Sequence, residues 1–221
     1  MRHIAVGRMQ QHMRELYNRF AGQSLDRLSA LSDGIFAFAM TLLVLGLHVP
    51  VSDAIHRERD LLRALGALAP ALVTWLMSFL TLGIFWVGQQ TQLSRFARGD
   101  RDLTWIHMGF LLSVTLIPFS TALLAEFITY RTALVVYWLN IVLLGAMLLA
   151  ALRYATRAGL LKADTTPEMV VAMNRRIIVA QSLYAIGALL SVVNTSLSIA
   201  FIVLVQLNYA IAPRIRPLYR I

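Results

Sequence analysis

The sequence has no cysteine, which excludes disulfide bonds and thiol chemistry. Charge is scarce as well. Only 14% of the residues are charged, against about 25% in soluble domains, while 58% are hydrophobic. Long uncharged runs recur along the chain, a pattern that a soluble domain with a large core would not show. The composition therefore indicates a membrane protein.

The common catalytic motifs are missing too. There is no G-x-x-x-x-G-K-[ST] loop, no G-x-G-x-x-G, no H-E-x-x-H and no cysteine pair for a metal. The 11 acids lie mostly between the apolar runs, and none form a pair suited to acid–base catalysis. We therefore expect neither an enzyme nor a cofactor, and the remaining classes are a conduit, a carrier and a structural membrane protein.

The net charge of +9 could suggest nucleic-acid binding. Here the basic residues fall between the apolar segments, where membrane topology places them, so no nucleic-acid partner is expected. Residues 1–23 form a basic leader whose apolar residues recur at helical spacing, which suits a helix on an anionic cytoplasmic surface. An unstructured leader is the alternative. A single membrane domain over 24–213 and a basic tail over 214–221 follow.

The apolar segments predict an all-α membrane protein with six membrane-spanning helices, since about 20 helical residues cross the hydrocarbon core. Sixteen of the 20 basic residues lie on one side of this arrangement, so both termini are expected in the cytoplasm. A short polar helix precedes the second span, and Thr166-Pro167-Glu168 predicts the start of the helix that leads into the fifth. The expected spans cover 28–49, 64–90, 103–126, 132–152, 177–193 and 196–212.

The first span combines an apolar run with polar residues. Residues 34–49 carry no charge, whereas Arg27, Ser32 and Asp33 occupy the first turns. A charge just inside a membrane is costly and by default indicates a functional site. The alternative for Asp33 is an acid stabilised by the positive end of its helix.

Two further polar residues lie within spans. His107 has two interpretations: a buried, hydrogen-bonded histidine, or a member of one polar cluster with Arg27 and Asp33. Asn140 lies at mid-membrane, where bonding between helices is the modest expectation and ligand binding the alternative. Pro118 interrupts the third span, and nearby hydroxyls can satisfy the carbonyl that it frees.

One stripe of the first span has helical i, i+3, i+4, i+7 spacing. On spacing alone, such a stripe is more typical of a contact between helices than of a pore. Its members are Phe38, Thr41, Leu42 and Leu45.

The order Arg27-x-x-x-Leu31-Ser32-Asp33-Gly34, followed by Thr41, resembles the first-helix signature of the prokaryotic potassium channels related to the endosomal/lysosomal potassium channel (transmembrane protein 175 family). Leu31 stands where that signature has Phe. The stretch 116–124, with the pattern L-x-P-F-x-T-A-L-L, is also similar to the family. The resemblance covers nearly the whole chain.

The resemblance implies a homotetramer in which four copies of the first helix surround a potassium path. Phe38 and Leu45 would form narrow apolar rings, and Thr41, beside Leu42, would supply a layer of hydroxyls. Family members usually carry Ile or Leu where Phe38 stands. Apolar rings can gate by dewetting, and hydroxyls can replace part of the hydration shell of potassium. No metal site is expected beyond this path.

The resemblance further implies a polar network that holds the first helix at its cytoplasmic end. The family has a histidine one turn after the tryptophan of the second span, and this chain has glutamines there, which do not titrate near neutral pH. Family members look to carry Asn near the position of His107. The residues assigned to the network are Arg27, Ser32, Asp33, Trp86, Gln89, Gln90 and His107.

Together these observations predict a potassium-selective or potassium-preferring channel in the cell membrane, with potassium ions, the lipid bilayer and other copies of the chain as partners. Three alternatives stay open. One is a secondary ion- or proton-coupled carrier that uses Asp33, His107 and Asn140 as its polar site. The others are a proton-permeable leak channel of the same architecture and a scaffold that transports nothing.

Overall fold

The structure, a computed structural model, describes residue 13 and residues 24–211. The expected leader, apart from residue 13, and the expected tail lie outside the described residues. Within them the chain is helical and has no strand, so the expected all-α class is confirmed for this part. In order the elements are α2 (Leu25–Val44), η1 (Ser52–Ala54), α3 (Glu58–Ala67), α4 (Ala69–Leu93), α5 (Arg101–Thr115), α6 (Ile117–Glu126), α7 (Arg131–Arg157), α8 (Pro167–Leu190) and α9 (Thr195–Ile211).

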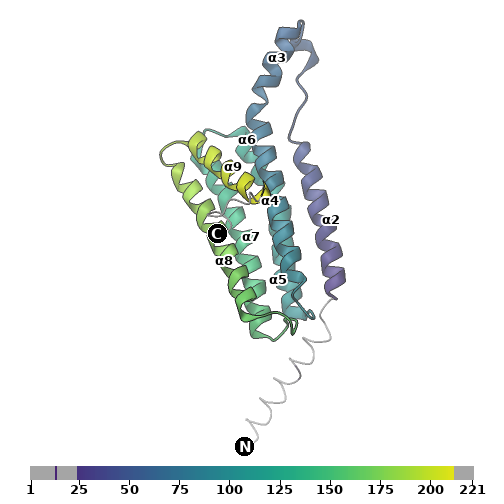
Figure 1. The fold of residues 1–221 in the computed structure, drawn as a ribbon. Helices are drawn as coiled ribbons and strands as arrows, with labels where there is room; N and C mark the ends of the chain where they lie inside the picture. The colour runs from purple at the N-terminus through teal and green to yellow at the C-terminus, as the bar shows by residue number, and fades with distance from the viewer. Residues whose placement is uncertain (1–12, 14–23, 212–221) are drawn as a thin grey trace, which may run out of the picture.

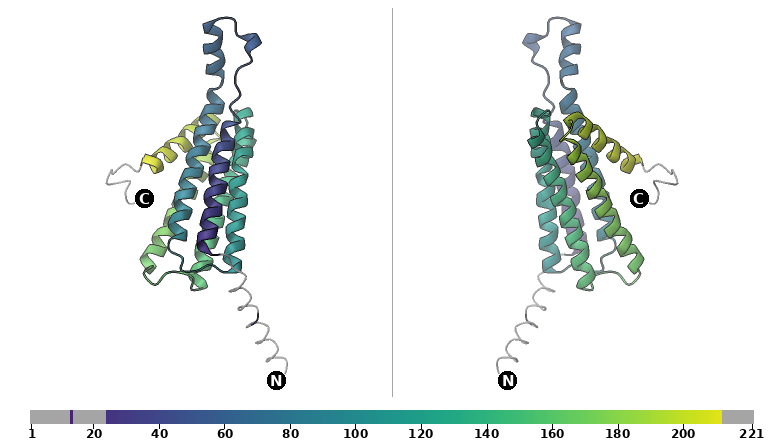
Figure 2. Two further views of the ribbon diagram at one scale, coloured as in Figure 1. Left: turned by 90° about the vertical axis from the view of Figure 1, so that its right-hand side faces the viewer. Right: turned by 90° about the vertical axis from the view of Figure 1, so that its left-hand side faces the viewer.

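The helices form an elongated bundle with α2 at one edge and α8 at the opposite edge (Figure 1). Helix α2 packs on α4, α5 and α6, whereas α8 packs on α7 and α9. Helix α3 continues the line of α4 beyond the end of the bundle (Figure 1). Helix α9 starts at that same end and crosses it obliquely, so it does not run the length of the bundle as the longer helices do (Figure 2).

Helix α2 begins where the sequence supplies a cap and an acid. The side chain of Ser24 accepts a hydrogen bond from the backbone N–H of Arg27 at 3.3 Å, and Asp26 lies in the first turn. The helix ends at Val44, five residues before the expected end at 49. Proline disfavours helical geometry in the residue before it, and it cannot donate to the carbonyl four residues back. A helix therefore cannot continue through the stretch that leads to Pro50.

Prolines divide two of the expected spans. Pro70 lies in the first turn of α4 and separates it from α3, so the expected second span is two nearly continuous helices. Pro118 lies in the first turn of α6 and separates it from α5, which confirms the expected interruption. The hydroxyls of Ser120 and Thr121 donate to the carbonyl of Ile117, at 3.1 and 2.7 Å.

The expected start of the fifth helical segment is confirmed. The Thr166 hydroxyl accepts from the backbone N–H of Met169, Pro167 opens α8, and Glu168 follows. A hydrogen bond with Thr166 lowers the pKa of the Glu168 carboxyl from its usual value. Helix α8 also contacts α7 closely. At Gly145 of α7, a Cβ would overlap the side chain of Gln181 of α8.

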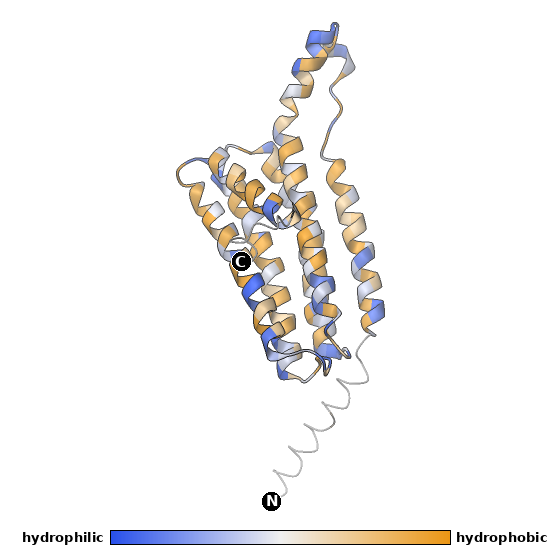
Figure 3. Cartoon of the chain, in the orientation of Figure 1, coloured by the Kyte–Doolittle hydropathy of each residue, from blue (hydrophilic) through white to orange (hydrophobic). Residues whose placement is uncertain are grey.

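Among the described residues, four helical segments are long and apolar enough to cross a membrane: Leu25–Val44, Ala69–Leu93, Arg101–Glu126 and Arg131–Arg157. Helix α9 is a shorter apolar helix, and α8 has two arginines, Arg175 and Arg176, within it. Apolar residues cover the middle of the bundle, and hydrophilic ones gather at the tip near α3 and at the opposite end (Figure 3). The hydropathy pattern thus fits a bundle that spans a bilayer.

Candidate functional site

Helix α2 has two distinct faces. One face is buried against the bundle and carries Leu28, Ser32, Phe36, Ala39 and Leu43. Phe36 packs against Phe110 of α5, with ring centroids 5.9 Å apart. This buried face fixes the rotation of α2 and so decides which residues lie on its other side.

The other face holds the predicted stripe. Phe38 is 65% exposed, Leu45 is 68% exposed, Thr41 is exposed and Leu42 is half-buried. The Thr41 hydroxyl donates to the carbonyl of Phe38 at 2.8 Å, which leaves its oxygen lone pairs directed away from the helix backbone. Leu45 is the residue directly after the last turn of α2. A single subunit therefore leaves an apolar stripe with one hydroxyl uncovered.

The N-terminal half of α2 is hydrogen-bonded to the bundle through Ser32, which is fully buried. Its hydroxyl donates to the carbonyl of Leu28 at 2.7 Å and accepts from Nε2 of Gln89 at 3.2 Å. Nε2 of His107 lies 2.7 Å from the same oxygen. Because the hydroxyl proton is already used on Leu28, Nε2 of His107 is the donor, and both lone pairs of Ser32 are filled.

Asp33 forms a second tie one residue further on. Its Oδ1 accepts hydrogen bonds from Nε1 of Trp86 at 2.8 Å and from Nε2 of Gln90 at 2.7 Å. The amide oxygen of Gln90 in turn accepts a hydrogen bond from the Ser29 hydroxyl at 3.1 Å. Trp86 and Gln90 thus bond to helix α2, as the predicted network requires.

Arg27 does not join Asp33. In the described part of the chain no ion pair links the two, and both side chains are exposed. The predicted cluster is therefore divided, with His107 and Gln89 around Ser32 and with Trp86 and Gln90 around Asp33. His107 is thus a buried, hydrogen-bonded histidine whose partner is Ser32, and it shares no hydrogen bond with Arg27 or Asp33 among the described residues.

Asn140 lies in a different polar cluster. Its amide donates to the Ser120 hydroxyl at 3.2 Å, which fits the expected bond between helices. Asp33, His107 and Asn140 share no hydrogen bond among the described residues, so they do not form one directly bonded carrier site. No group of three or more His, Cys, Asp or Glu residues suited to hold a metal occurs in the stretch that the structure describes.

Comparisons with known proteins agree with this geometry. A sequence model of the family described as endosomal/lysosomal potassium channel TMEM175 matches residues 27–118, which include α2 and its partners α4 and α5. A protein of Chamaesiphon minutus named a potassium channel is 32% identical over 190 residues, covering 84% of this chain and 93% of the relative. The chain belongs to the TMEM175 family.

Two further comparisons extend the TMEM175 match. A protein of Streptomyces collinus named a potassium channel is 37% identical over 137 residues, covering 60% of this chain and 65% of that relative. The crystal structure of a lysosomal potassium-selective channel TMEM175 homolog from Chamaesiphon minutus superposes with a TM-score of 0.74 at 27% identity. That match covers 86% of this chain and 98% of the other, so the TMEM175 likeness extends beyond the first helices.

Sequence reasoning missed three polar residues inside the TMEM175-like bundle: Thr81, Tyr137 and Gln206. The Tyr137 hydroxyl lies 3.2 Å from the Ser78 hydroxyl and 3.0 Å from that of Thr81, and Gln206 of α9 donates to Thr81 at 2.7 Å. These residues tie α4, α7 and α9 together at the centre of the bundle. Their polar atoms inside apolar spans were the available signal, since such groups require partners in a membrane.

Proposed function

We propose that this protein is a passive potassium channel whose ion path is lined by the exposed face of α2. The observation that carries the proposal is the exposed stripe of Phe38, Thr41 and Leu45, opposite a fully packed face of the same helix. Membership of the TMEM175 family and relatives named potassium channels support it. The family is one of ion channels and not of enzymes.

The stripe suits ion conduction in a closed ring of copies. A ring of phenyl groups from Phe38 and a ring from Leu45 would be too apolar to replace water around an ion, so each can close the path by dewetting. The hydroxyl of Thr41 lies between them and can replace part of the hydration shell without a fixed charge. Partial dehydration favours potassium, which holds its water less tightly than sodium does.

A homotetramer with six helices in the membrane per subunit is part of the proposal. One copy of α2 cannot surround a path, and cyclic symmetry supplies the others. The distribution of basic residues supports a cytoplasmic location for both termini in the cell membrane. Cross-linking in mild detergent should give a four-subunit product, and saturation at two subunits would contradict the tetramer. A C-terminal reporter active only outside the cytoplasm would contradict the topology.

The test of conduction is potassium flux into vesicles that contain the purified protein, repeated with sodium. Phe38→Ala should raise the flux severalfold and weaken the discrimination between the two ions, because a wider ring lowers the dehydration barrier. Thr41→Val keeps the side-chain shape but removes the hydroxyl, so it should reduce selectivity without affecting assembly. Leu43→Ala, on the buried face, is the control and should change stability more than flux.

Unchanged flux and reversal potential in both stripe variants, with the tetramer intact, would show that α2 does not line the path. Saturating flux coupled to a second ion would indicate a carrier, and acidification of the vesicles without potassium movement would indicate a proton leak. Absence of any flux from correctly assembled wild-type protein would leave a scaffold.

A further inference from the structure

A cavity with a volume of about 80 Å³ lies between α4, α7 and α8, on the side of the bundle away from α2. Its walls are mostly apolar and include Ile84 and Phe85 of α4, Leu148 of α7 and Ile177 of α8. Tyr209, near the end of α9, also lines it. A site of this kind, apolar with a few polar groups, is typical of those that bind small amphiphilic molecules.

Two polar atoms at this cavity lack a partner among the described residues. They are the amide oxygen of Gln181 and the hydroxyl of Tyr209. The hydroxyl of Tyr184, which also lines the cavity, lies instead beside Gln206 and Thr81 of the central polar cluster. Buried groups of this kind indicate a ligand with hydrogen-bonding atoms.

The charge at the cavity indicates that the ligand is negatively charged. Arg176 is exposed at the rim, and no acidic residue lines the cavity. In the described ranges the two ion pairs join Arg63 to Asp60 and Arg95 to Asp164, so neither neutralises Arg176. A guanidinium group binds phosphate oxygens through paired N–H donors, which makes phosphate a good match for this rim.

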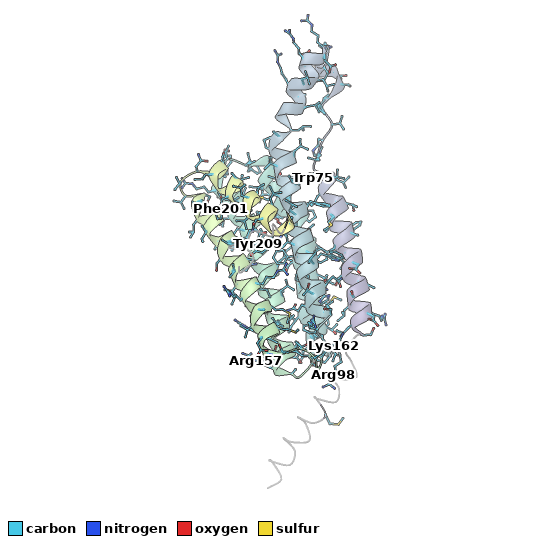
Figure 4. All side chains as sticks on the ribbon, viewed as in Figure 1. Trp75, Arg98, Arg157, Lys162, Phe201 and Tyr209 are labelled. Atoms are coloured by element: carbon cyan, nitrogen blue, oxygen red, sulfur yellow. The ribbon has the colours of Figure 1, made fainter. Side chains whose placement is uncertain are left out.

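The depth of the rim suits a lipid headgroup. Helix α8 starts at the end of the bundle where Arg98, Arg157 and Lys162 gather, which is the proposed cytoplasmic end (Figure 4). Arg176 follows Pro167 by nine residues, or about 14 Å at the helical rise. A long arginine side chain at this level can reach the headgroup region of the inner leaflet, where anionic lipids concentrate.

We propose that this cavity binds an anionic phospholipid of the cytoplasmic leaflet. The phosphate bonds to Arg176, and an ester oxygen accepts from the hydroxyl of Tyr209. A cavity of about 80 Å³ holds only the ester segment and the first part of one acyl chain. The rest of that chain lies along the outer surface beside Ile84 and Ile177, within the bilayer.

Native mass spectrometry of the delipidated protein in detergent tests the proposal. The probes are dioleoyl phosphatidylglycerol and dioleoyl phosphatidylcholine, which differ only in the headgroup. Wild-type protein should retain more phosphatidylglycerol than phosphatidylcholine per subunit, and Arg176→Gln should reduce retention of phosphatidylglycerol about fivefold. Arg175→Gln is the matched control, because it removes the neighbouring charge without touching the cavity lining.

A second variant tests the apolar part without changing charge. A Cβ at Gly88, which lines the cavity, meets no atom within 4 Å, so the side chain introduced by Gly88→Phe starts in open space and can enter the cavity. It should reduce retention of both lipids. Equal retention by wild type, Arg176→Gln and Gly88→Phe would overturn the proposal. So would a change in subunit number in either variant, which would assign the cavity to contact with a second copy. These outcomes do not depend on ion flux, so they leave the channel proposal untouched.

Discussion

Replacing Ser32 by alanine should loosen the N-terminal half of α2 more than the loss of one oxygen atom suggests. The Ser32 hydroxyl is the meeting point of three groups: the carbonyl of Leu28, Nε2 of His107 and the amide of Gln89. The Leu28 carbonyl keeps its partners in the helix, but the two donors lose their acceptor. The side chains of Ser32, His107 and Gln89 are all buried, so water does not replace the lost hydroxyl oxygen.

The size of the effect follows from this count. A hydrogen bond between helices in a membrane contributes about 0.6 kcal/mol on average, because the unfolded chain in the membrane also finds partners. The two bonds that cross between helices, to His107 and Gln89, give about 1 kcal/mol at that average. Two donors left fully unsatisfied would raise the loss, since each costs about 1–3 kcal/mol in a dry interior. We therefore expect Ser32→Ala to lower the free energy of unfolding by about 2–4 kcal/mol.

Reversible unfolding in mixed detergent and SDS micelles measures this change. Ser29→Ala is the matched control, because Ser29 is half-buried on the same helix and makes one bond, to Gln90. The free energy of unfolding of Ser29→Ala should fall by less than about 1 kcal/mol. His107→Asn, which keeps an N–H donor, should lose less than His107→Leu. If Ser32→Ala and Ser29→Ala proved equally stable, Ser32 would not be the point that holds α2.

Three further results are expected. Leu43 is 4% exposed, so Leu43→Ala should cost about 2–5 kcal/mol of stability, whereas Phe38→Ala should cost far less; equal losses in the same unfolding assay would contradict the assigned rotation of α2. Asp33→Ala removes an exposed acceptor of two hydrogen bonds and should cost about 1 kcal/mol by thermal unfolding, while a severalfold larger loss would indicate a buried ion pair instead. Gly145→Ala places a Cβ on the side chain of Gln181, which must turn away and lose its hydrogen bond to the carbonyl of Ile141, so it should cost about 0.6 kcal/mol more than Gly83→Ala, whose Cβ meets nothing; equal stability of the two variants would show that Gln181 moves aside without loss.

Much of the helical fold could be predicted because its signals are local. Thr166-Pro167-Glu168 starts α8, and Pro118 divides α5 from α6, as their chemistry requires. The end of α2 was placed five residues too late, because an apolar run does not reveal how far before Pro50 the helix ends. Helix α9 was expected as an ordinary span, and its oblique course depends on packing that periodicity cannot show (Figure 2).

The candidate site could be predicted only in part, for a related reason. The stripe on α2 follows from helical spacing, and its exposure agrees with that spacing. The partition of the polar residues does not follow from sequence, because Ser32 and Asp33 are adjacent yet point to different neighbours. The sequence placed Arg27 and Asp33 in one network, but the Asp33 carboxylate accepts from the neutral donors Trp86 and Gln90 and forms no ion pair with Arg27 among the described residues.

The contacts at the base of α2 have a consequence for the conditions in which the protein works. Salt weakens attraction between exposed opposite charges over about 8–10 Å at physiological ionic strength, and it hardly affects short hydrogen bonds in a buried interior. The buried ties made through Ser32 join hydroxyl, amide and imidazole groups, and the ties of Asp33, although exposed, run to uncharged donors and not to a cation. The orientation of α2 at Ser32 should therefore stay constant when the potassium concentration on either side of the membrane rises or falls, and in the proposed channel the permeant ion then does not alter the geometry of its path.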